Sequence, residues 1–273
     1  MRVRSPAPVD RLTLPVVETF HSLQGEGLHA GRSAFFLRLG GCAVGCPWCD
    51  TKHSWPADAH PQRSLAELTG EARAAATAGA AFAVVTGGEP LEHDLGPLCA
   101  ALDQTATGLP LHLETSGAAP LALSGAFAWI TLSPKRHRPP SPALLAACDE
   151  LKVVVHEPAD LAFAEAMAEQ ALNARRGSAP RSAVVAVPAN GGFGTHGVAA
   201  PEGPSVGEPP LLQASQVAAT PRGVEPGAGP TGPALLLQPG WNCRRGQELA
   251  IGFVRSHPPW RLSLQSHKWL GVR

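Results

Sequence analysis

Three cysteines lie close together in the sequence, at Cys42, Cys46 and Cys49. Their spacing, CxxxCxxC, supplies three thiolates with no fourth cysteine nearby. A structural zinc site or an ordinary [4Fe–4S] cluster uses four protein ligands. Three grouped thiolates therefore favour a [4Fe–4S] cluster in which one iron stays open for a small molecule. The same residues could instead form a zinc site that His53 or a distant ligand completes.

The residues around these cysteines suit a bulky cofactor. Gly40, Gly41 and Gly45 let the backbone wrap closely around a cluster. Trp48 comes directly before the third cysteine, where it could stack on an adenine ring or pack in the core. A loop of this kind resembles that of the radical S-adenosylmethionine (SAM) enzymes. In those enzymes SAM binds the open iron, and reduction of the cluster yields a 5′-deoxyadenosyl radical.

Three polar motifs follow predicted strands, at 86–90 (TGGEP), 114–117 (ETSG) and 133–135 (SPK). In α/β sheets, ligands bind beyond the carboxyl ends of the strands. The glycines of the first motif leave backbone groups free for an amino group, and the hydroxyls of the second could hold a ribose or a carboxylate. Taken alone, each motif could be a turn, a helix cap or a surface lysine. Together, after the cysteine loop, they indicate one binding site.

Arg38 lies in the apolar run 34–39, where an unpaired charge would be costly. We expect its guanidinium to meet a carboxylate, either from a ligand or from Glu26 in the run 24–27 (QGEG). Because arginine pairs with carboxylates through two parallel hydrogen bonds, it is suited to reading a substrate carboxylate. A purely structural Arg–Glu pair is the alternative.

Short apolar runs alternate with helical patterns along the chain. Strands are predicted at 34–39, 82–86, 111–114, 128–132, 150–155, 183–187, 235–238 and 261–264. Several of these runs are almost wholly apolar, as parallel strands covered on both faces should be. Helices are predicted from the Ser64/Glu67 capping box to Ala78, at 158–176 with Gly177 as a stop, and at 247–255. The alternation predicts an α/β fold with a mostly parallel sheet, either open or rolled into a partial barrel.

The composition excludes several classes of protein. The formal net charge is +0 at pH 7, which disfavours nucleic acids and membrane surfaces as partners. No apolar run is long enough to span a bilayer, and residues 1–10 lack the apolar core of a signal peptide. The scattered Cys99, Cys148 and Cys243 do not complete a disulfide framework. We therefore expect a cytoplasmic protein.

Residues 191–232 break the pattern because they are dense in Gly and Pro and have no apolar period. Such a composition predicts an inserted loop that is disordered rather than a structured lid. The rest of the pattern is continuous on both sides of this segment. We therefore expect one domain over residues 1–273.

The longer motifs are similar to those of one family, the 7-carboxy-7-deazaguanine synthases, which are radical SAM enzymes of queuosine biosynthesis. The most specific matches are 23–27 (LQGEG), 49–53 (CDTKH) and 261–268 (RLSLQSHK). The cysteine spacing and the TGGEP run mark the wider superfamily. The similarity covers nearly the whole chain apart from its first residues and the Gly/Pro-rich segment.

The resemblance implies a partial, modified radical SAM barrel that catalyses a radical ring contraction. The substrate would be 6-carboxy-5,6,7,8-tetrahydropterin and the product 7-carboxy-7-deazaguanine, with loss of ammonia. SAM would be regenerated and would thus act as a cofactor, together with a [4Fe–4S] cluster and Mg²⁺. Family members are homodimers and need a one-electron donor such as flavodoxin.

The resemblance also implies roles for individual residues. The cluster would be held by Cys42, Cys46 and Cys49. SAM would be contacted by Trp48, Cys49, Asp50, Gly88, Ser116, Ser133, Pro134 and Lys135. The pterin would be contacted by Leu23, Gln24, Gly25, Glu26, Arg38 and Thr86. Thr51 would help to bind Mg²⁺, a hard ion that prefers oxygen ligands.

Two other functions share part of this pattern. An activase of glycyl-radical enzymes would have the cysteine loop and the glycine run, but it would not need Arg38 or the run 24–26. A zinc-stabilised binding module without catalysis would have zinc and no sulfide. A plain electron-transfer protein would need a fourth cluster ligand, which the sequence does not offer.

Overall fold

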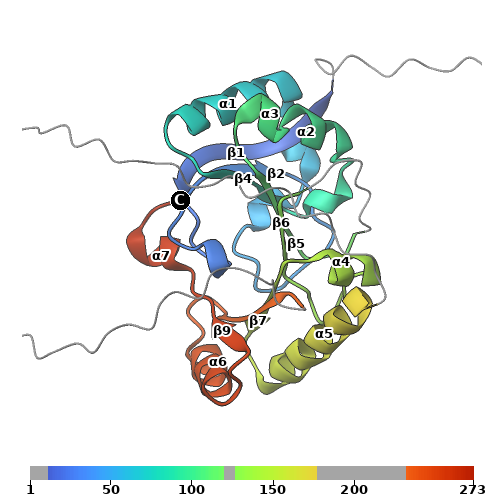
Figure 1. The fold of residues 1–273 in the computed structure, drawn as a ribbon, viewed down its shortest axis with the longest axis vertical. Helices are drawn as coiled ribbons and strands as arrows, with labels where there is room; N and C mark the ends of the chain where they lie inside the picture. The colour runs from blue at the N-terminus through green and yellow to red at the C-terminus, as the bar shows by residue number, and fades with distance from the viewer. Residues whose placement is uncertain (1–11, 120–126, 177–231) are drawn as a thin grey trace, which may run out of the picture. The chain divides into compact units, whose positions relative to one another are not determined.

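The computed structural model describes residues 12–119, 127–176 and 232–273, all of which belong to one compact unit. Within these residues, nine strands form one sheet in the order β3-β1-β2-β4-β5-β6-β7-β8-β9 (Figure 1). The strands are β1 (Thr13–Leu23), β2 (Ser33–Leu39), β3 (Gln62–Ser64), β4 (Phe82–Gly87), β5 (Leu111–Thr115), β6 (Trp129–Leu132), β7 (Glu150–Val155), β8 (Ala234–Pro239) and β9 (Trp260–Leu262). From β2 to β9 all neighbours are parallel, whereas β1 pairs antiparallel with β2 and β3. The predicted α/β class and mostly parallel sheet are confirmed.

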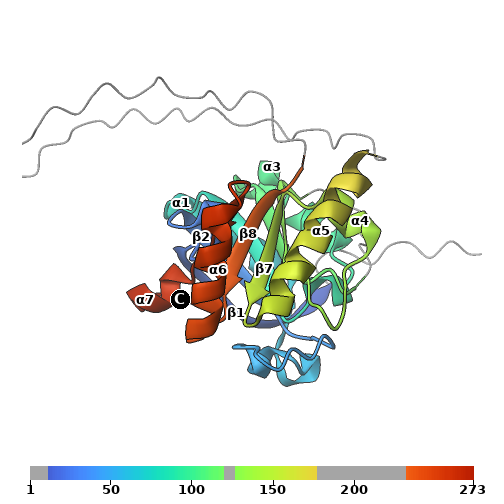
Figure 2. The ribbon, with the colours of Figure 1, turned by 90° about the horizontal axis from the view of Figure 1, so that it is seen from below.

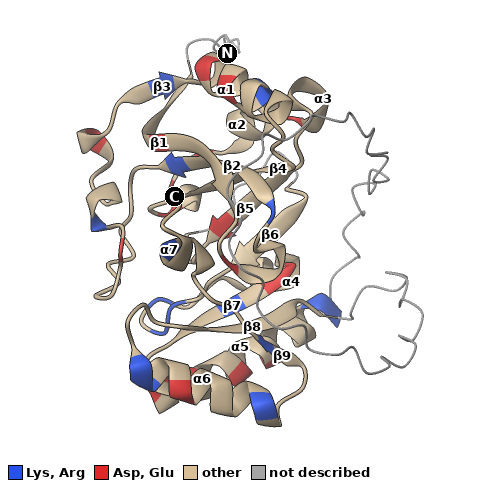
Figure 3. Cartoon of the chain, turned by 90° about the vertical axis from the view of Figure 1, so that its left-hand side faces the viewer, with Lys and Arg blue, Asp and Glu red and all other residues tan. Residues whose placement is uncertain are grey.

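Helices flank this sheet, most of them on its outer face. They are α1 (Leu65–Thr77), α2 (Gly96–Ala101), α3 (Gln104–Thr107), α4 (Pro142–Ala147), α5 (Pro158–Arg176), α6 (Arg244–Ser256) and α7 (Ser266–Leu270), with short 3₁₀ turns η2 (Gly27–His29), η3 (Lys52–Ser54), η4 (Ala57–Ala59) and η5 (Pro90–Glu92). Helices α5 and α6 lie along β7 and β8 (Figure 2). The exposed side of α6 carries charges of both signs (Figure 3). None of the helices in the described ranges is long and apolar enough to cross a membrane.

Alternate residues of each strand face opposite sides of the sheet, and the two sides differ in polarity. Leu37, Val85, Leu113 and Ile130 belong to the buried cluster that packs under the helices. Removal of this apolar surface from water, at about 25 cal/mol per Å², is the main force that holds the layers together. The residues between them on the strands face the other side, which carries a small apolar cluster of Ala34, Phe36, Phe82 and Val84 and, toward the carboxyl ends of the strands, polar and charged side chains.

The predicted helix starts and ends agree closely with the structure. The Ser64 hydroxyl accepts a hydrogen bond from the Glu67 N–H at 3.3 Å, and the Ser64 N–H donates to the Glu67 carboxylate at 2.9 Å. This reciprocal capping box begins α1 where the sequence predicted it. Helix α5 has the predicted bounds, although the proposed stop at Gly177 lies outside the described residues. Helix α6 is longer than predicted because Cys243, whose sulfur accepts from the Gly246 N–H at 3.3 Å, caps it earlier.

Other elements differ from the prediction. Strand β1 was not predicted, since its polar and apolar residues do not form one apolar run. Its pairing with β2, which sets Phe20 opposite Phe36, makes it a strand. Strand β9 ends two residues earlier than predicted, where the Ser263 N–H bonds the Leu237 carbonyl at 2.9 Å and the chain turns toward α7. The predicted strand 183–187 and residues 191–231 of the Gly/Pro-rich segment lie outside the described residues.

Candidate active site

A cavity of about 550 Å³ opens on the polar side of the sheet, near the carboxyl ends of the strands. Because it is lined by residues of β2, β4, β5, β6, β7 and β8, the sheet must curl around it. Most of the predicted site residues line it: Leu23, Gln24, Gly25, Glu26, Arg38, Cys46, Trp48, Cys49, Asp50, Thr51, Thr86, Gly88, Ser116, Ser133 and Lys135. Cys42 and Pro134 lie outside the lining. The fold thus brings the cysteine loop, the three polar motifs and the run 23–26 to one cavity.

The cysteine loop is held by backbone contacts on both sides. The Gly41 and Cys42 N–H groups donate to the carbonyls of Ser54 and Trp55 at 2.7 and 3.0 Å. From the other side, the His137 ring contacts the Val44 carbonyl at 3.0 Å, and the Arg138 guanidinium donates to the Ala43 carbonyl. The loop is therefore fixed between η3 and the turn that follows β6.

Two of the three thiols of this loop lie in surroundings that disfavour a free thiolate. Cys46 is buried, whereas Cys42 and Cys49 are partly exposed. Burial raises the pKa of the Cys42 and Cys46 thiols, and at Cys46 the nearby Lys135 ammonium opposes this rise. When no cation is bound, burial favours the protonated form of these two thiols. Bound iron would supply the positive charge that stabilises the thiolates.

The glycine run and the cysteine loop approach each other more closely than side chains would allow. A Cβ atom at Gly88 would lie 2.1 Å from the Gly41 carbonyl oxygen and 2.9 Å from the Cys42 Cβ. Gly41 itself has φ +105°, a left-handed conformation that favours glycine. The backbone here forms a narrow cradle beside the thiols. The three thiols suit a cluster that is held by three thiolates and keeps one iron open for a small ligand.

No group of three or more His, Cys, Asp and Glu side chains converges as a single-ion site would, within the part of the chain that the structure describes. A four-iron cluster does not require such convergence, because each thiolate binds its own iron.

The first and second motifs, 86–90 and 114–117, are tied together by the buried Glu89 carboxylate. Thr115 donates to its Oε1 at 2.5 Å, and the Ser116 N–H donates to its Oε2 at 2.8 Å. The Ser116 hydroxyl also donates to this carboxylate, so it braces the loop in addition to lining the cavity. Lys135 donates to the Ser133 hydroxyl at 2.8 Å, and burial lowers the pKa of its ammonium.

Trp48 is not a core residue, because 44% of its surface is exposed. Its ring lies 5.0 Å from that of His156 and 5.8 Å from that of His137, on the rim of the cavity. A flat aromatic surface beside Cys49 can therefore receive a planar ligand group. This exposure excludes the core alternative, and the stacking role stays a prediction.

Arg38 pairs with Glu18 and not with Glu26, which corrects the expected protein partner. Its Nε lies 3.0 Å from Glu18 Oε1, since the antiparallel register of β1 and β2 sets the two residues opposite each other. Glu18 was not predicted as the partner because strand β1, on which it lies, was not predicted. Arg38 still lines the cavity, where a ligand carboxylate can reach it. Arg273 contacts the other Glu18 oxygen at 3.0 Å.

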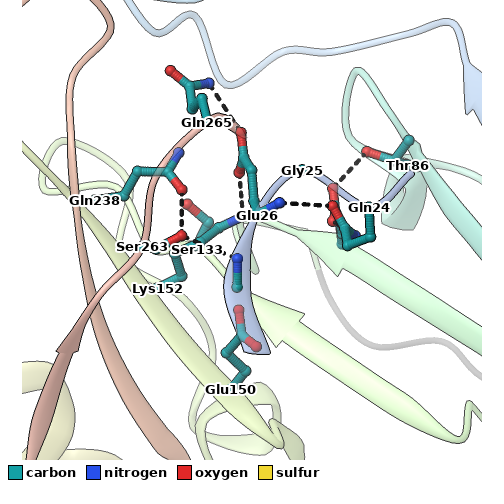
Figure 4. Close-up of polar contacts among 12 residues, drawn as sticks. Gln24, Gly25, Glu26, Thr86, Ser133, Glu150, Lys152, Gln238, Ser263 and Gln265 are labelled. Carbon is teal, nitrogen blue, oxygen red and sulfur yellow. Dashed lines mark hydrogen bonds and ion pairs between the residues drawn. The ribbon is translucent and has the colours of Figure 1, made fainter. Parts of the chain in front are cut away.

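Glu26 instead pairs with Lys152, an almost fully buried residue of β7 (Figure 4). Burial acts to raise the pKa of Glu26, but the Lys152 ammonium and the amide groups of Gln265 and Gln238 outweigh it and lower this pKa to about 2. For Lys152, burial is likewise outweighed, and the carboxylates of Glu26, Glu114 and Glu150 raise its pKa. Both groups therefore stay charged inside the cavity wall.

Glu114 organises a neighbouring part of the cavity wall. Its Oε1 accepts from the Gln24 amide at 2.9 Å and its Oε2 from the Thr86 hydroxyl at 3.2 Å. The C-terminal helix α7 adds His267 and Lys268 to the lining, and Lys268 donates to Asp50 beside the cysteine loop. The predicted set of site residues omits Glu114, Lys152, Gln238, Gln265, His267 and Lys268. The signal that could have found them is charged or polar residues in otherwise apolar strands, together with the 261–268 motif.

The comparisons with known proteins agree with this site. The chain is 46% identical to the 7-carboxy-7-deazaguanine synthase of Prochlorococcus marinus over 264 residues, which is 95% of this chain and 98% of the relative. It is 39% identical to that of Synechocystis over 272 residues, 98% of this chain and 100% of the relative. The chain belongs to the 7-carboxy-7-deazaguanine synthase family. Members of this family are radical SAM lyases, whose chemistry uses SAM and a [4Fe–4S] cluster.

The fold agrees as well. The crystal structure of QueE from Escherichia coli matches with a TM-score of 0.62 at 24% identity, over 94% of this chain and 96% of that one. At this identity the match shows the fold, a radical SAM partial barrel. No family model matches the sequence. The glycyl-radical activase and the zinc module are not favoured by these findings.

Proposed function

We propose that this chain converts 6-carboxy-5,6,7,8-tetrahydropterin into 7-carboxy-7-deazaguanine with release of ammonia, as a step toward queuosine. The product and ammonia together contain the atoms of the substrate, so the rearrangement needs no net oxidant. The observation that carries the proposal is the family relationship, which extends over almost the full length of the relatives. The cavity supports it by gathering the cysteine loop and the QGEG run around one space.

In this proposal, Cys42, Cys46 and Cys49 hold a [4Fe–4S] cluster. When bound, the cluster and SAM supply the one-electron chemistry that starts a radical reaction. The residues proposed to contact SAM are Trp48, Cys49, Asp50, Gly88, Ser116, Ser133, Pro134 and Lys135. Trp48 offers a flat surface on the cavity rim, and Gly88 lines the cavity where the glycine run packs closely against the cysteine loop.

The pterin is proposed to occupy the wall formed by Leu23, Gln24, Gly25, Glu26, Arg38 and Thr86. Arg38 would orient the substrate carboxylate, because a guanidinium beside the cavity is the natural partner of that group. Gln24 and Thr86 are both bonded to Glu114, which fixes their positions before the substrate arrives. Fixed polar groups hold the substrate in one orientation.

We also propose that Thr51 helps to bind Mg²⁺ next to the substrate. Its hydroxyl lies 3.5 Å from the Cys49 sulfur and lines the cavity, and a hydroxyl oxygen suits this hard ion. Replacement of Thr51 by Ala should weaken the stimulation by Mg²⁺, which a titration of the turnover rate with Mg²⁺ measures. An identical titration curve would remove Thr51 from the ion site.

The proposal extends to the surroundings of the enzyme. Support comes from the family resemblance, which implies a homodimer, a reductant such as flavodoxin and a cytoplasmic location. Neither nucleic acid nor a membrane is proposed as a partner, in keeping with the neutral net charge.

An anaerobic turnover assay tests the reaction directly. Reconstituted protein is mixed with SAM, dithionite, Mg²⁺ and 6-carboxytetrahydropterin, and the products are identified by mass spectrometry. The proposal predicts 7-carboxy-7-deazaguanine without matching consumption of SAM. Cleavage of SAM without this product would reject the pterin substrate and direct the search to another one.

A further inference from the structure

Lys152 has no role in the proposal above, although it occupies a central position in the cavity wall. It lies on β7 with 4% of its surface exposed and faces the polar side of the sheet. Three carboxylates, those of Glu26, Glu114 and Glu150, act on its ammonium. A lysine buried this deeply is rare unless it is paired, so its partners must offset the loss of hydration.

The closest partner is Glu26, which lies between Lys152 of β7 and Gln265, the residue before α7. Lys152 Nζ lies 2.5 Å from Glu26 Oε2, and the Gln265 amide donates to Glu26 Oε1 at 2.9 Å (Figure 4). Each carboxylate oxygen can accept a further hydrogen bond. Glu26 also lines the cavity. The carboxylate is thus fixed from two sides while acceptor capacity remains for a ligand.

The other groups near this pair cannot replace the lysine. Burial raises the pKa of Glu150, and a carboxyl group cannot supply the positive charge that Lys152 places beside Glu26. Burial also lowers the pKa of Lys135 and of His267, the nearest other basic groups on the turn after β6 and on α7. Without Lys152, less would compensate the burial of Glu26, and the pKa of its carboxyl would rise.

We propose that Lys152 is a positioning residue, which holds the Glu26 carboxylate ionised and in place as an acceptor for N–H groups of the pterin. This inference rests on the proposed function. A tetrahydropterin carries an amino group and ring N–H groups, and an ionised carboxylate is a stronger acceptor for them than a neutral acid. Lys152 acts through Glu26 and needs no contact with the substrate.

The test compares four variants with the reconstituted wild type: Lys152→Met, Lys152→Arg, Glu26→Gln and the double variant Glu26→Gln/Lys152→Met. Arg63→Met is the matched control, because it breaks a partly buried ion pair with Glu71 away from the cavity. Lys152→Met should raise the KM for the pterin roughly tenfold to a hundredfold, with a smaller effect on kcat. Cluster absorbance and SAM cleavage without pterin should stay unchanged. Lys152→Arg should recover part of the loss, and Arg63→Met should show none.

The pH dependence separates positioning from a general loss of structure. In Lys152→Met, kcat/KM should rise with pH across the neutral range as Glu26 ionises, whereas the wild type should show no such rise. The double variant should lack this dependence and should match Glu26→Gln in KM, because Lys152 would act only through Glu26. A Lys152→Met enzyme with the KM and pH profile of the wild type would overturn the inference. Additive losses in the double variant would overturn it as well.

Unfolding measurements without substrate test the Lys152–Glu26 ion pair independently of turnover. In the wild type, the lowered pKa of Glu26 contributes stability that is present above about pH 4.5 and lost as the pH falls toward 2. In Lys152→Met this carboxyl should titrate in the opposite sense, with stability lost as the pH rises toward neutral. The same pH dependence in both proteins would refute the pairing. If wild-type protein made no 7-carboxy-7-deazaguanine, the proposed function would fail while this measurement still judged the ion pair.

Discussion

The interior of the curled sheet has two ends, and buried titratable side chains are charged at one end and neutral at the other. The cavity end, near the carboxyl ends of the strands, keeps Glu26 and Lys152 ionised although both are buried. The barrel floor, which we define as His29, Phe82, His112 and Trp129 near the amino ends, keeps its histidines neutral. Burial lowers the pKa of His29 to about 4 and that of His112 to about 3.

The difference lies in the partners that each end provides. At the floor, His112 stacks on Phe82 with ring centroids 4.2 Å apart and lies 4.8 Å from His29, while the neighbouring charge is the cation Arg32. Aromatic rings and a like charge favour the neutral imidazole. At the cavity end, opposite charges face each other. Burial suppresses charge where no counter-charge accompanies it, and opposite charges in contact preserve it.

The largest expected effect is at the cavity end, with Cys46→Ala. Removal of one of three thiolates should abolish the cluster and all turnover, because no nearby cysteine can replace the ligand. Iron and sulfide analysis of the reconstituted protein measures this, and circular dichroism should show that the fold persists. The buried Cys99→Ala, outside the cavity, serves as the control and should retain the cluster. Stoichiometric iron and sulfide in Cys46→Ala would refute its ligation.

Arg38→Ala should have a smaller effect, which is confined to the pterin. Loss of one charged hydrogen-bonding group should cost about 2 kcal/mol, roughly 30-fold in kcat/KM. Cluster content and SAM cleavage should not change, because the arginine is bonded to Glu18 rather than to the cysteine loop. Steady-state kinetics with varied pterin check this outcome. Unchanged pterin turnover would mean that Arg38 is only the structural partner of Glu18.

At the floor, His112→Phe should change the pH dependence of stability and leave turnover unaffected. An unfolded histidine takes up a proton as the pH falls below 6.5, whereas folded His112, with a pKa of about 3, does not, so acid favours unfolding. The variant lacks this proton uptake and should lose about 2 kcal/mol less stability than the wild type between neutral pH and about pH 5. Guanidinium unfolding at the two pH values measures the change. His21→Phe, at an exposed position, is the control, and equal acid losses in His112→Phe and the wild type would contradict the neutral floor.

The sequence alone was sufficient for the local features. The cysteine spacing, the apolar strands and the capping box at Ser64 depend on neighbours in the chain, and the structure places β2, β4, β5, β6, β7, β8 and α1 where those patterns predicted them. The family could also be recognised, since its motifs are short runs of adjacent residues. The roles assigned to individual site residues remain proposals.

The partners of buried charges were decided only by the tertiary structure. Arg38 meets Glu18 because β1 and β2 pair in an antiparallel register, and Lys152 meets Glu26 because residues 24–28 are bonded to β7 and to the segment after β9. A charged residue in an apolar run predicts a partner of opposite charge, because an unpaired buried charge is costly. Which carboxylate supplies it depends on residues far apart in the chain that folding brings within hydrogen-bond distance. Local patterns therefore predicted the strands and the cofactor loop, and long-range pairing set the electrostatics of the site.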